Sequence, residues 1–320
     1  MARHGPRRIL PRLVLPFWIR RQSLLLRDLL VNRERPDLVA LARIEDPEGF
    51  VWAILPHAAR TFAACIALMP KRAALTSAVA YLYCRMLDTY EDLVPSRAAR
   101  EASLRAFAAR LSTTGGGSLP PAPAIADADD GDQRDRAHLL LVRRAHLVDR
   151  VFVSLDPATR EVVRDLVRDM ADGMCWSSAT FEAQGGVLAD EGQLGEYCRH
   201  VLGNPVLFGI RLMRLHYGNT QALTAEEHED AMRVGELVQL ANVTRDVEKD
   251  LRRGIAYEAS LRGDLGRDAT SRNPVADASL TERCRVVRER LLRLALRRAP
   301  SYARVIEALR LPSWSIARAS

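Results

Sequence analysis

Residues 81–94, YLYCRMLDTYEDLV, join an apolar helical run to three carboxylates. Asp88, Glu91 and Asp92 are spaced i, i+3 and i+4, so a helix places all three on one face. Like charges on one face repel each other, and the negative end of the helix dipole adds to that repulsion. A bound cation removes the conflict. Hard ions such as Mg²⁺ take few carboxylate oxygens and leave the rest of their shell to water and phosphate.

A second acidic segment, QLANVTRDVEKD, occupies residues 239–250. Asp246 and Asp250 share one helical face, and Gln239 and Asn242 continue that face into the apolar part of the run. Amides and acids on a core-facing stripe cost free energy unless they meet polar partners. For either segment alone, the alternative is a solvated helix end with surface ion pairs. Two such segments on two apolar helices favour a shared cation site.

Arginines accompany both acidic segments. Arg60 lies in HAARTF, Arg85 lies one turn before Asp88, and Arg245 adjoins Asp246. Guanidinium groups offer fixed donors to phosphate oxygens, which a metal ion neutralises at the same time. Each arginine alone is more often a surface residue. Together with the acids, they predict a diphosphate site lined by helices.

The composition predicts an all-α fold. The 320 residues are 48% hydrophobic and 27% charged, which is ample for a globular core. The chain is rich in Ala, Leu and Arg, which favour helix over strand, and no segment has a convincing strand pattern. We expect a basic N-terminal arm over residues 1–40 and one helical domain over residues 41–320. A flexible insertion, rich in Gly, Pro, Ala and Asp, is expected near residues 112–136.

Several predicted helices have clear end signals. Pro70 suits the first turn of a helix that Pro95 ends. Thr224 and Glu227 form a capping box, and Gly254 suits the end of the helix that follows it. The predicted helices span residues 70–94, 134–152, 157–182, 193–217 and 224–254, and a last helix starts near residue 280.

The net charge and the cysteine content limit which partners and which cellular compartment we expect. The net charge of +7 suits anionic partners, or else reflects free use of arginine by a GC-rich genome. The arginines interleave with acids instead of forming one stripe, so we expect no nucleic-acid partner. Five scattered cysteines without a CxxC pair predict a reducing, cytoplasmic compartment. The sequence does not predict an oligomeric state.

No apolar run approaches the roughly 18 residues that a membrane span needs. The N-terminal arm, MARHGPRRILPRLVLPFWIRRQ, is basic with an apolar centre and has no small-residue cleavage site, so we do not expect a signal peptide. The arm either rests on a membrane surface or is an ordinary packed or disordered segment.

Four segments, in this order, resemble motifs of the squalene/phytoene synthase family over roughly residues 58–257. ARTF resembles the family's Ser-Arg-Ser-Phe segment, and YLYCRMLDTYED resembles its first acidic motif. EYCRHVLGNPV resembles the Tyr-Cys-x-x-Val-Ala-Gly segment, and QLANVTRDVEKD resembles the second acidic motif. Any one of these segments alone would be a weak signal, whereas four in order with similar spacing are a strong one.

The resemblance implies a helical bundle with a central cavity and Mg²⁺-dependent head-to-head joining of two prenyl diphosphates, usually farnesyl diphosphate. NADPH would supply hydride if squalene is the product, although no glycine-rich dinucleotide fingerprint marks a site for it. The resemblance implies metal binding by Asp88, Asp92, Asp246 and Asp250, with Glu91 assisting. It implies diphosphate binding by Arg60, Arg85 and Arg245, a cavity lined by Phe62, Tyr81, Gln239 and Asn242, and proton transfer at Tyr197.

Three departures from the family pattern leave the product branch open. Lys249 replaces a usual Glu of the second acidic motif, and Ile255 replaces a usual Arg beyond it, whereas Tyr257 is kept. Asn204-Pro205-Val206 resembles the hydroxysqualene synthase branch, whereas the first acidic motif resembles squalene synthases. We expect squalene first, then presqualene diphosphate or hydroxysqualene, then phytoene. The alternative is a cyclase-like homologue that binds prenyl diphosphates with altered activity.

Overall fold

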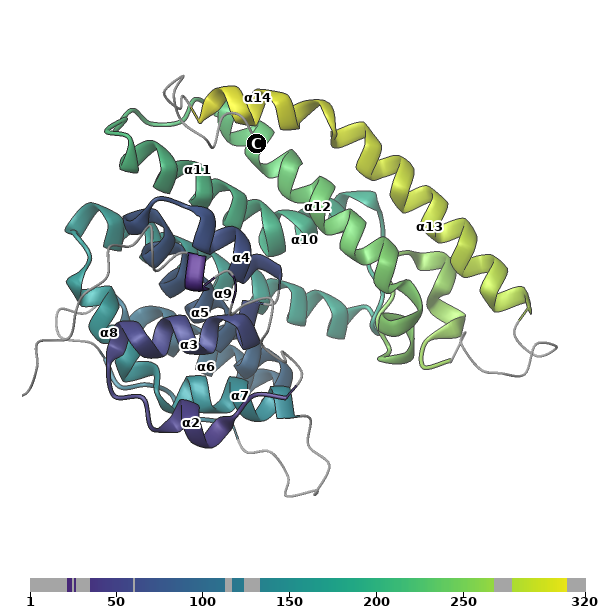
Figure 1. Ribbon diagram of the computed structural model, residues 1–320. Coiled ribbons are helices and arrows are strands. Elements are labelled where there is room, and N and C mark those ends of the chain that lie inside the picture. The colour runs from purple at the N-terminus through teal and green to yellow at the C-terminus, as the bar shows by residue number, and fades with distance from the viewer. Residues whose placement is uncertain are drawn as a thin grey trace, which may run out of the picture.

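The computed structural model describes residues 22–24, 26, 35–59, 61–112, 117–123, 133–267 and 278–309. Within these ranges the regular structure is helical, and the nearest thing to a strand is one isolated bridge between Val187 and Ala256. The predicted all-α class is confirmed (Figure 1). None of the described helices is both long enough and apolar enough to cross a bilayer.

The helices form two groups along the chain. The first comprises α2 (Leu38–Ala42), α3 (Pro47–Ala59), α4 (Thr61–Leu68), α5 (Lys71–Leu93), α6 (Arg97–Arg110), α7 (Gln133–Arg143), α8 (Ala145–Ser154) and α9 (Pro157–Ala183). The second comprises α10 (Glu191–Cys198), the π-helical turn η1 (Arg199–Gly203), α11 (Asn204–His216), α12 (Ala225–Arg252), the 3-10 turn η2 (Ala259–Asp264), α13 (Ala278–Arg298) and α14 (Pro300–Ala308).

Helix ends follow the expected signals at α5 and α12. Pro70 precedes α5, which ends two residues before Pro95. Thr224 and Glu227 form the capping box of α12, and Gly254 adopts a φ of 80° just beyond its end. In both helices the local chemistry of the chain therefore agrees with the tertiary structure.

Two predicted helices are wrong in their continuity, whereas the last one starts at Ala278, close to the expected residue 280. The one predicted over residues 134–152 is two helices that meet at Arg144, whose guanidinium donates to the carbonyls of Ala42 and Ile44. That contact is tertiary, so no local pattern announces it. The helix predicted over residues 193–217 contains the π turn η1. Helix α13 ends at Arg298, and α14 follows it from Pro300.

The predicted arm and insertion lie largely outside the described residues. Helix α2 crosses the expected end of the arm at residue 40. Of the insertion, residues 117–123 are described, and there the Tyr90 hydroxyl donates to the carbonyl of Pro120 at 2.8 Å. This hydrogen bond ties the middle of the insertion to α5.

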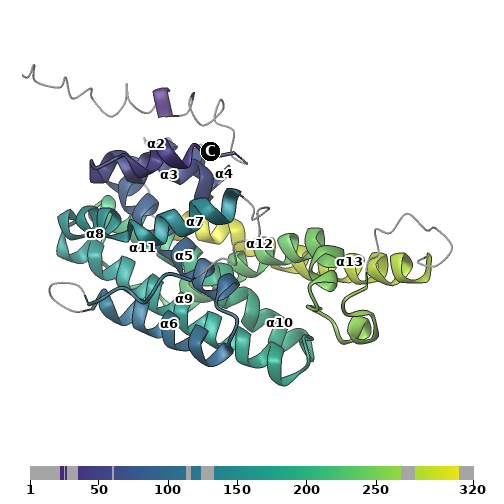
Figure 2. The same ribbon diagram turned by 90° about the horizontal axis from the view of Figure 1, so that it is seen from below.

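Three apolar clusters support the described helices, and the third joins Leu207 and Ile210 of α11 to Ala231 of α12. The first contains the fully buried side chains of Phe50, Tyr83 and Leu147 on α3, α5 and α8. The second lies between α10, α12 and α13 and includes Leu240 and Leu251 on α12. Figure 2 shows α12 and α13 extending to one side of the first group. The two acidic segments therefore belong to different cores, α5 to the first and α12 to the second.

A backbone contact between two glycines joins η1 to α12. Pro205 has no N–H to donate to Val201, so the α-helical ladder is interrupted there, and Asn204 N–H bonds to the Arg199 carbonyl instead. A Cβ on Gly235 would lie 2.6 Å from the carbonyl carbon of Leu202 and would also overlap the backbone of Gly203. Only glycine at this position of α12 allows the two backbones to approach so closely.

We expect Gly235→Ala to lower the free energy of unfolding by about 1–3 kcal/mol, since the added methyl group forces η1 away from α12. Gly209→Ala on α11 is the matched control, because its Cβ would meet no atom within 4 Å. The control should raise stability by about 0.5–1 kcal/mol through helix propensity. Chemical denaturation of both variants measures the difference. Equal stability of the two variants would contradict the close approach.

Candidate active site

The first acidic segment opens onto a small cavity. Asp88 and Glu91, near the end of α5, line a hollow of about 120 Å³, whereas Asp92 is exposed and lies outside its lining. The other lining residues come from α9, α10 and η1: Met170, Gly173, Met174, Ser177, Tyr197, His200 and Val201. The cavity therefore lies where the first helix group meets the second.

The carboxylates of α5 are held in an unfavourable environment for negative charge. Burial raises the pKa of Asp88, the Arg85 guanidinium opposes that rise, and Asp92 adds to it. Burial, with the charges of Asp88 and Asp92, raises the pKa of Glu91 to about 8, and Arg100 opposes this. Two of the three acids thus lack enough neutralising charge from the protein itself, as the sequence pattern predicted.

Arg85 is fixed between the acids and the predicted aromatic wall. Its Nη1 lies 3.0 Å from Asp88 Oδ2, and its Nη2 donates to the Tyr81 hydroxyl at 3.2 Å. The Tyr81 ring in turn lies 6.1 Å from the ring of Phe62, which is about half exposed. The structure therefore brings Phe62, Tyr81 and Arg85 together beside Asp88. Arg60 lies outside the described residues.

The second acidic segment lies along α12. Arg245 pairs with its neighbour Asp246 at 2.6 Å, and this hydrogen bond lowers the pKa of the Asp246 carboxyl. Asn242 donates to Gln239 Oε1 at 3.3 Å, and Gln239 is buried. The polar stripe predicted along this helix is therefore present. Gln239 and Asn242 do not line the 120 Å³ cavity, so their predicted place in the cavity wall is not seen at this hollow.

Asp250 has a hydrogen-bond donor that the sequence reading did not assign to the site. The Tyr257 hydroxyl donates to Asp250 Oδ2 at 3.0 Å. Burial raises the pKa of Asp250, and this hydrogen bond opposes the rise. The charges of Lys249 and Arg253 also lower it, although both side chains are exposed. Lys249 therefore acts on the second acidic segment from its outer side.

Tyr197 connects the two acidic segments. Its ring lies 5.4 Å from that of Tyr257, and Phe181 packs edge-on against both. Burial raises the pKa of Tyr197, a hydrogen bond with Tyr257 opposes the rise, and the charges of Glu91 and Asp250 add to it. Tyr197 thus lies within electrostatic reach of a carboxylate on α5 and of one on α12.

A short bridge between two loops positions Tyr257. The Ala256 N–H donates to the Gly186 carbonyl at 2.8 Å, and the Leu188 N–H donates to the Ala256 carbonyl at 3.1 Å. Gly186 has a φ of 86°, and a Cβ there would overlap the carbonyl of Gly254. The α9–α10 loop therefore holds the segment that follows α12. The only sequence signal for Tyr257 was its place in the family pattern.

Helix α9 supplies cavity residues that the sequence reading missed. Met170, Gly173, Met174 and Ser177 line the hollow, but their spacing is that of an ordinary core-facing stripe. His200 of η1 also lies in the cavity wall. Trp176 lies beside His200 but does not line this hollow.

The carboxylates suit a metal ion that binds together with a phosphate-bearing ligand. Among the described residues, no three acidic, histidine or cysteine side chains converge into a ready-made cation cluster. Mg²⁺ is commonly held by one or two carboxylates, with substrate phosphates and water completing its shell. Asp88, Glu91 and Asp250 all have raised pKa values because of burial, so a cation would stabilise their charged forms.

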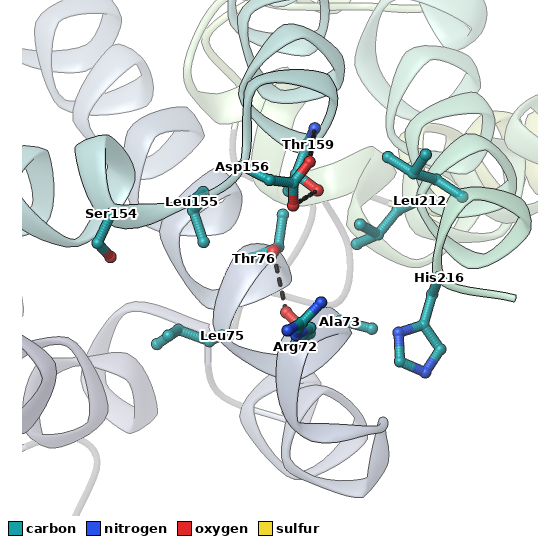
Figure 3. A pocket seen from close by; sticks show the side chains of 11 residues that line it. Arg72, Ala73, Leu75, Thr76, Ser154, Leu155, Asp156, Thr159, Leu212 and His216 are labelled. Atoms are coloured by element: carbon teal, nitrogen blue, oxygen red, sulfur yellow. Dashed lines mark hydrogen bonds between the residues drawn. The ribbon is translucent and has the colours of Figure 1, made fainter. Parts of the chain in front are cut away.

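A larger hollow, of about 520 Å³, lies at the other end of α5 (Figure 3). Arg72 and Thr76 line it from α5, Asp156 and Thr159 from the start of α9, and His216 from the end of α11. Asp88 follows Arg72 by about 24 Å along the helix, at 1.5 Å per residue. The hydroxyls of Thr76 and Thr159 already donate to Arg72 O and Asp156 Oδ2. This hollow is separate from the acidic site.

Comparison with known proteins gives one consistent answer. The family profile described as "Squalene/phytoene synthase" matches residues 55–313. "Squalene synthase BSS" of Botryococcus braunii is 28% identical over 210 residues, covering 65% of this chain and 41% of that protein. "Lycopaoctaene synthase" of the same organism is 29% identical over 217 residues, covering 65% and 43%. The matches thus span less than half the length of these two relatives.

Solved structures show the same fold. TcSQS in complex with the ligand BPH1237 superposes with a TM-score of 0.61 at 22% sequence identity, covering 84% of this chain and 74% of that one. TcSQS with the ligand E5700 gives a TM-score of 0.60, also at 22% identity, covering 86% and 75%.

We expect Tyr257→Phe to weaken Mg²⁺ binding about tenfold or more, because groups that hydrogen-bond a metal-ligating carboxylate contribute about 10–100-fold to affinity. The ring stays packed against Tyr197 and Phe181, and the hydrogen bonds of the hydroxyl with Asp250 and Tyr197 are lost. Titration of Mg²⁺ in an assay of diphosphate release measures the effect. Tyr302→Phe, at an exposed position of α14, is the control. An unchanged Mg²⁺ dependence in Tyr257→Phe would show that Asp250 does not need this donor.

Proposed function

This chain belongs to the squalene/phytoene synthase family, and we propose from that premise that it couples two prenyl diphosphates head to head with Mg²⁺. The observation that carries the proposal is the position of Tyr197, which lines one hollow with Glu91 of α5 and packs against Tyr257, the hydrogen-bond donor to Asp250 of α12. We take farnesyl diphosphate as the substrate and squalene as the product, formed through a cyclopropyl diphosphate.

In this proposal the acids and arginines work on the diphosphate groups. Asp88 and Asp92 on α5, and Asp246 and Asp250 on α12, hold Mg²⁺, with Glu91 assisting. When bound, Mg²⁺ neutralises the charge that develops on the departing diphosphate. Arg85, held by Asp88 and by the Tyr81 hydroxyl, offers donors fixed in direction. Arg60 and Arg245 are proposed to bind diphosphate as well.

The apolar part of the site protects the carbocations. Met170, Met174 and Val201 line the cavity beside the acids and keep water from the reacting carbons. We propose that Phe62, Tyr81, Gln239 and Asn242 line the wider substrate channel. The hollow of about 120 Å³ is smaller than the roughly 300–1,000 Å³ of sites for drug-sized ligands. We therefore propose that this hollow is the part of the substrate site that borders the acids.

The product branch is the finer part of the proposal. The Asp-Thr-x-Glu-Asp form of the first acidic segment supports squalene, for which NADPH supplies the hydride that ends the reaction. Asn204-Pro205-Val206 supports the alternative of presqualene diphosphate or hydroxysqualene, in which water ends it. Phytoene formation from longer chains is a further alternative. The cytoplasm, with the N-terminal arm in contact with a membrane surface, is the proposed location.

Incubation of the purified chain with farnesyl diphosphate and Mg²⁺ should give squalene when NADPH is present. Mass spectrometry of the extract, with and without NADPH, identifies the product. A coupled diphosphate or an alcohol formed without reductant would assign the chain to the alternative branch. The absence of any coupled product from both farnesyl and geranylgeranyl diphosphate would refute the coupling activity.

Replacing Asp88 or Asp250 by Asn should lower turnover at least about 10²-fold, since the metal supplies several kcal/mol of charge stabilisation in the transition state. Glu307→Gln, at an exposed position of α14, is the control and should keep wild-type turnover. Steady-state measurement of diphosphate release compares the three variants. Full activity in Asp250→Asn would remove α12 from the metal site.

Lys249 and Ile255 favour a second candidate function, that of a homologue that binds prenyl diphosphates without coupling them. The double variant Lys249→Glu/Ile255→Arg separates the two candidates, because it restores the family's charges beside Asp246 and Asp250. We expect turnover to rise several-fold. Unchanged turnover, together with tight binding of a prenyl diphosphate, would support the binding homologue instead.

A further inference from the structure

The π turn η1 places an imidazole in the wall of the acidic cavity. His200 and Val201 belong to this turn, and both line the hollow together with Glu91 and Tyr197. Turns of this type are rare in helices and are frequent at functional sites. Here the turn coincides with Pro205, which cannot continue the α-helical ladder.

The surroundings of His200 fix the place of its ring. Gly173 on α9 lies directly against it, because a Cβ at Gly173 would be 2.6 Å from His200 Cβ and 2.9 Å from His200 Nδ1. The indole of Trp176, one turn further along α9, has its ring centroid 5.2 Å from that of the imidazole. The absence of a side chain at Gly173 is therefore what allows an imidazole at this point of the cavity wall.

The charges around His200 suit a group that takes up a proton. Burial lowers the pKa of His200, and the carboxylates of Glu196, Asp172 and Asp169 oppose this. Burial therefore favours the neutral imidazole, which has one ring nitrogen able to accept a proton. Its Nε2 lies 3.9 Å from Glu196 Oε1, so the protonated ring gains an ion pair at once. Asp88, Glu91 and Tyr197 are the other titratable groups of the cavity wall.

The other polar side chains of this wall have different partners. The Ser177 hydroxyl donates to the Met174 carbonyl at 3.1 Å, and Asp88 pairs with Arg85. Tyr197 shares a hydrogen bond with Tyr257. Glu91 belongs to the proposed metal site. Among the lining residues, His200 is left as a neutral nitrogen base outside the metal site.

We propose that His200 accepts the proton that is released when the two prenyl chains are joined. The inference rests on the proposed function. The first diphosphate leaves with the electron pair of its C–O bond, and the double bond of the second chain attacks the allylic cation. A neighbouring C–H bond then breaks, and its electron pair closes the cyclopropane ring. The proton goes to the His200 lone pair, and the imidazolium pairs with Glu196 until it loses the proton to solvent.

The test compares diphosphate release with coupled product in His200→Gln, using the full chain, farnesyl diphosphate and Mg²⁺. Without the base, ionisation continues but the ring does not close, so water captures the cation as a prenyl alcohol. We expect coupled product per diphosphate released to fall about 10²-fold, within the range for loss of a general base. A merely structural role would lower both quantities together and leave their ratio unchanged, which would overturn the proposal.

Two further variants sharpen the test. His216→Gln, on α11 and outside the lining of the acidic cavity, should keep the wild-type ratio. Glu196 is half exposed, so Glu196→Gln leaves the core intact and should lower the ratio more mildly than His200→Gln, by roughly two- to tenfold. An unchanged ratio in both His200→Gln and Glu196→Gln refutes the role of His200.

The variant Tyr197→Phe tests whether Tyr197, instead of His200, is the base that accepts the proton. If Tyr197→Phe uncouples the reaction and His200→Gln does not, the proton leaves through Tyr197 and Tyr257, and the proposal is overturned. Coupled product from the wild type establishes the proposed function independently of either result. If the wild type forms no coupled product from farnesyl or geranylgeranyl diphosphate, the proposed function fails, and the role of His200 fails with it.

Discussion

The hydrogen bond from Tyr257 to Asp250 is the interaction on which the rest of the site depends. The two acidic segments belong to different apolar clusters, and α11 links them by packing both on the first cluster and on α12. Tyr257, held by the loop bridge at Gly186 and Ala256, contacts both Asp250 and Tyr197. Through Tyr197 the second core reaches the cavity that Glu91 lines from the first.

A site between two cores has a consequence for stability. Within one close-packed core, a cavity for two prenyl chains would remove many apolar contacts and cost stability. Between two cores, the space for a ligand interrupts fewer of the contacts inside either core. The Gly203–Gly235 contact fixes η1 against α12 within the second group, because the two elements touch there through their backbones.

The sequence predicted what local chemistry controls. The spacing of Asp88, Glu91 and Asp92 placed them on one face of α5, and the capping box at Thr224 located the start of α12. It did not predict the part of the cavity wall that α9 supplies. Gly173 lies in an ordinary core pattern, and only the structure shows that the His200 ring packs against it. The break at Arg144 was missed for the same reason, because its partners are about a hundred residues away.

The surroundings of Asp250 bear on the departures from the family pattern at Lys249 and Ile255. A cation beside a metal-binding carboxylate weakens metal binding less when solvent screens its charge. Lys249 is exposed to solvent, so its charge is screened. The Tyr257 hydroxyl, in contrast, contacts Asp250 directly at 3.0 Å. The retained tyrosine therefore governs Asp250 more strongly than the substituted lysine. For that reason the chain can depart from the family pattern at the exposed Lys249 and still keep the geometry that joins α12 to the cavity.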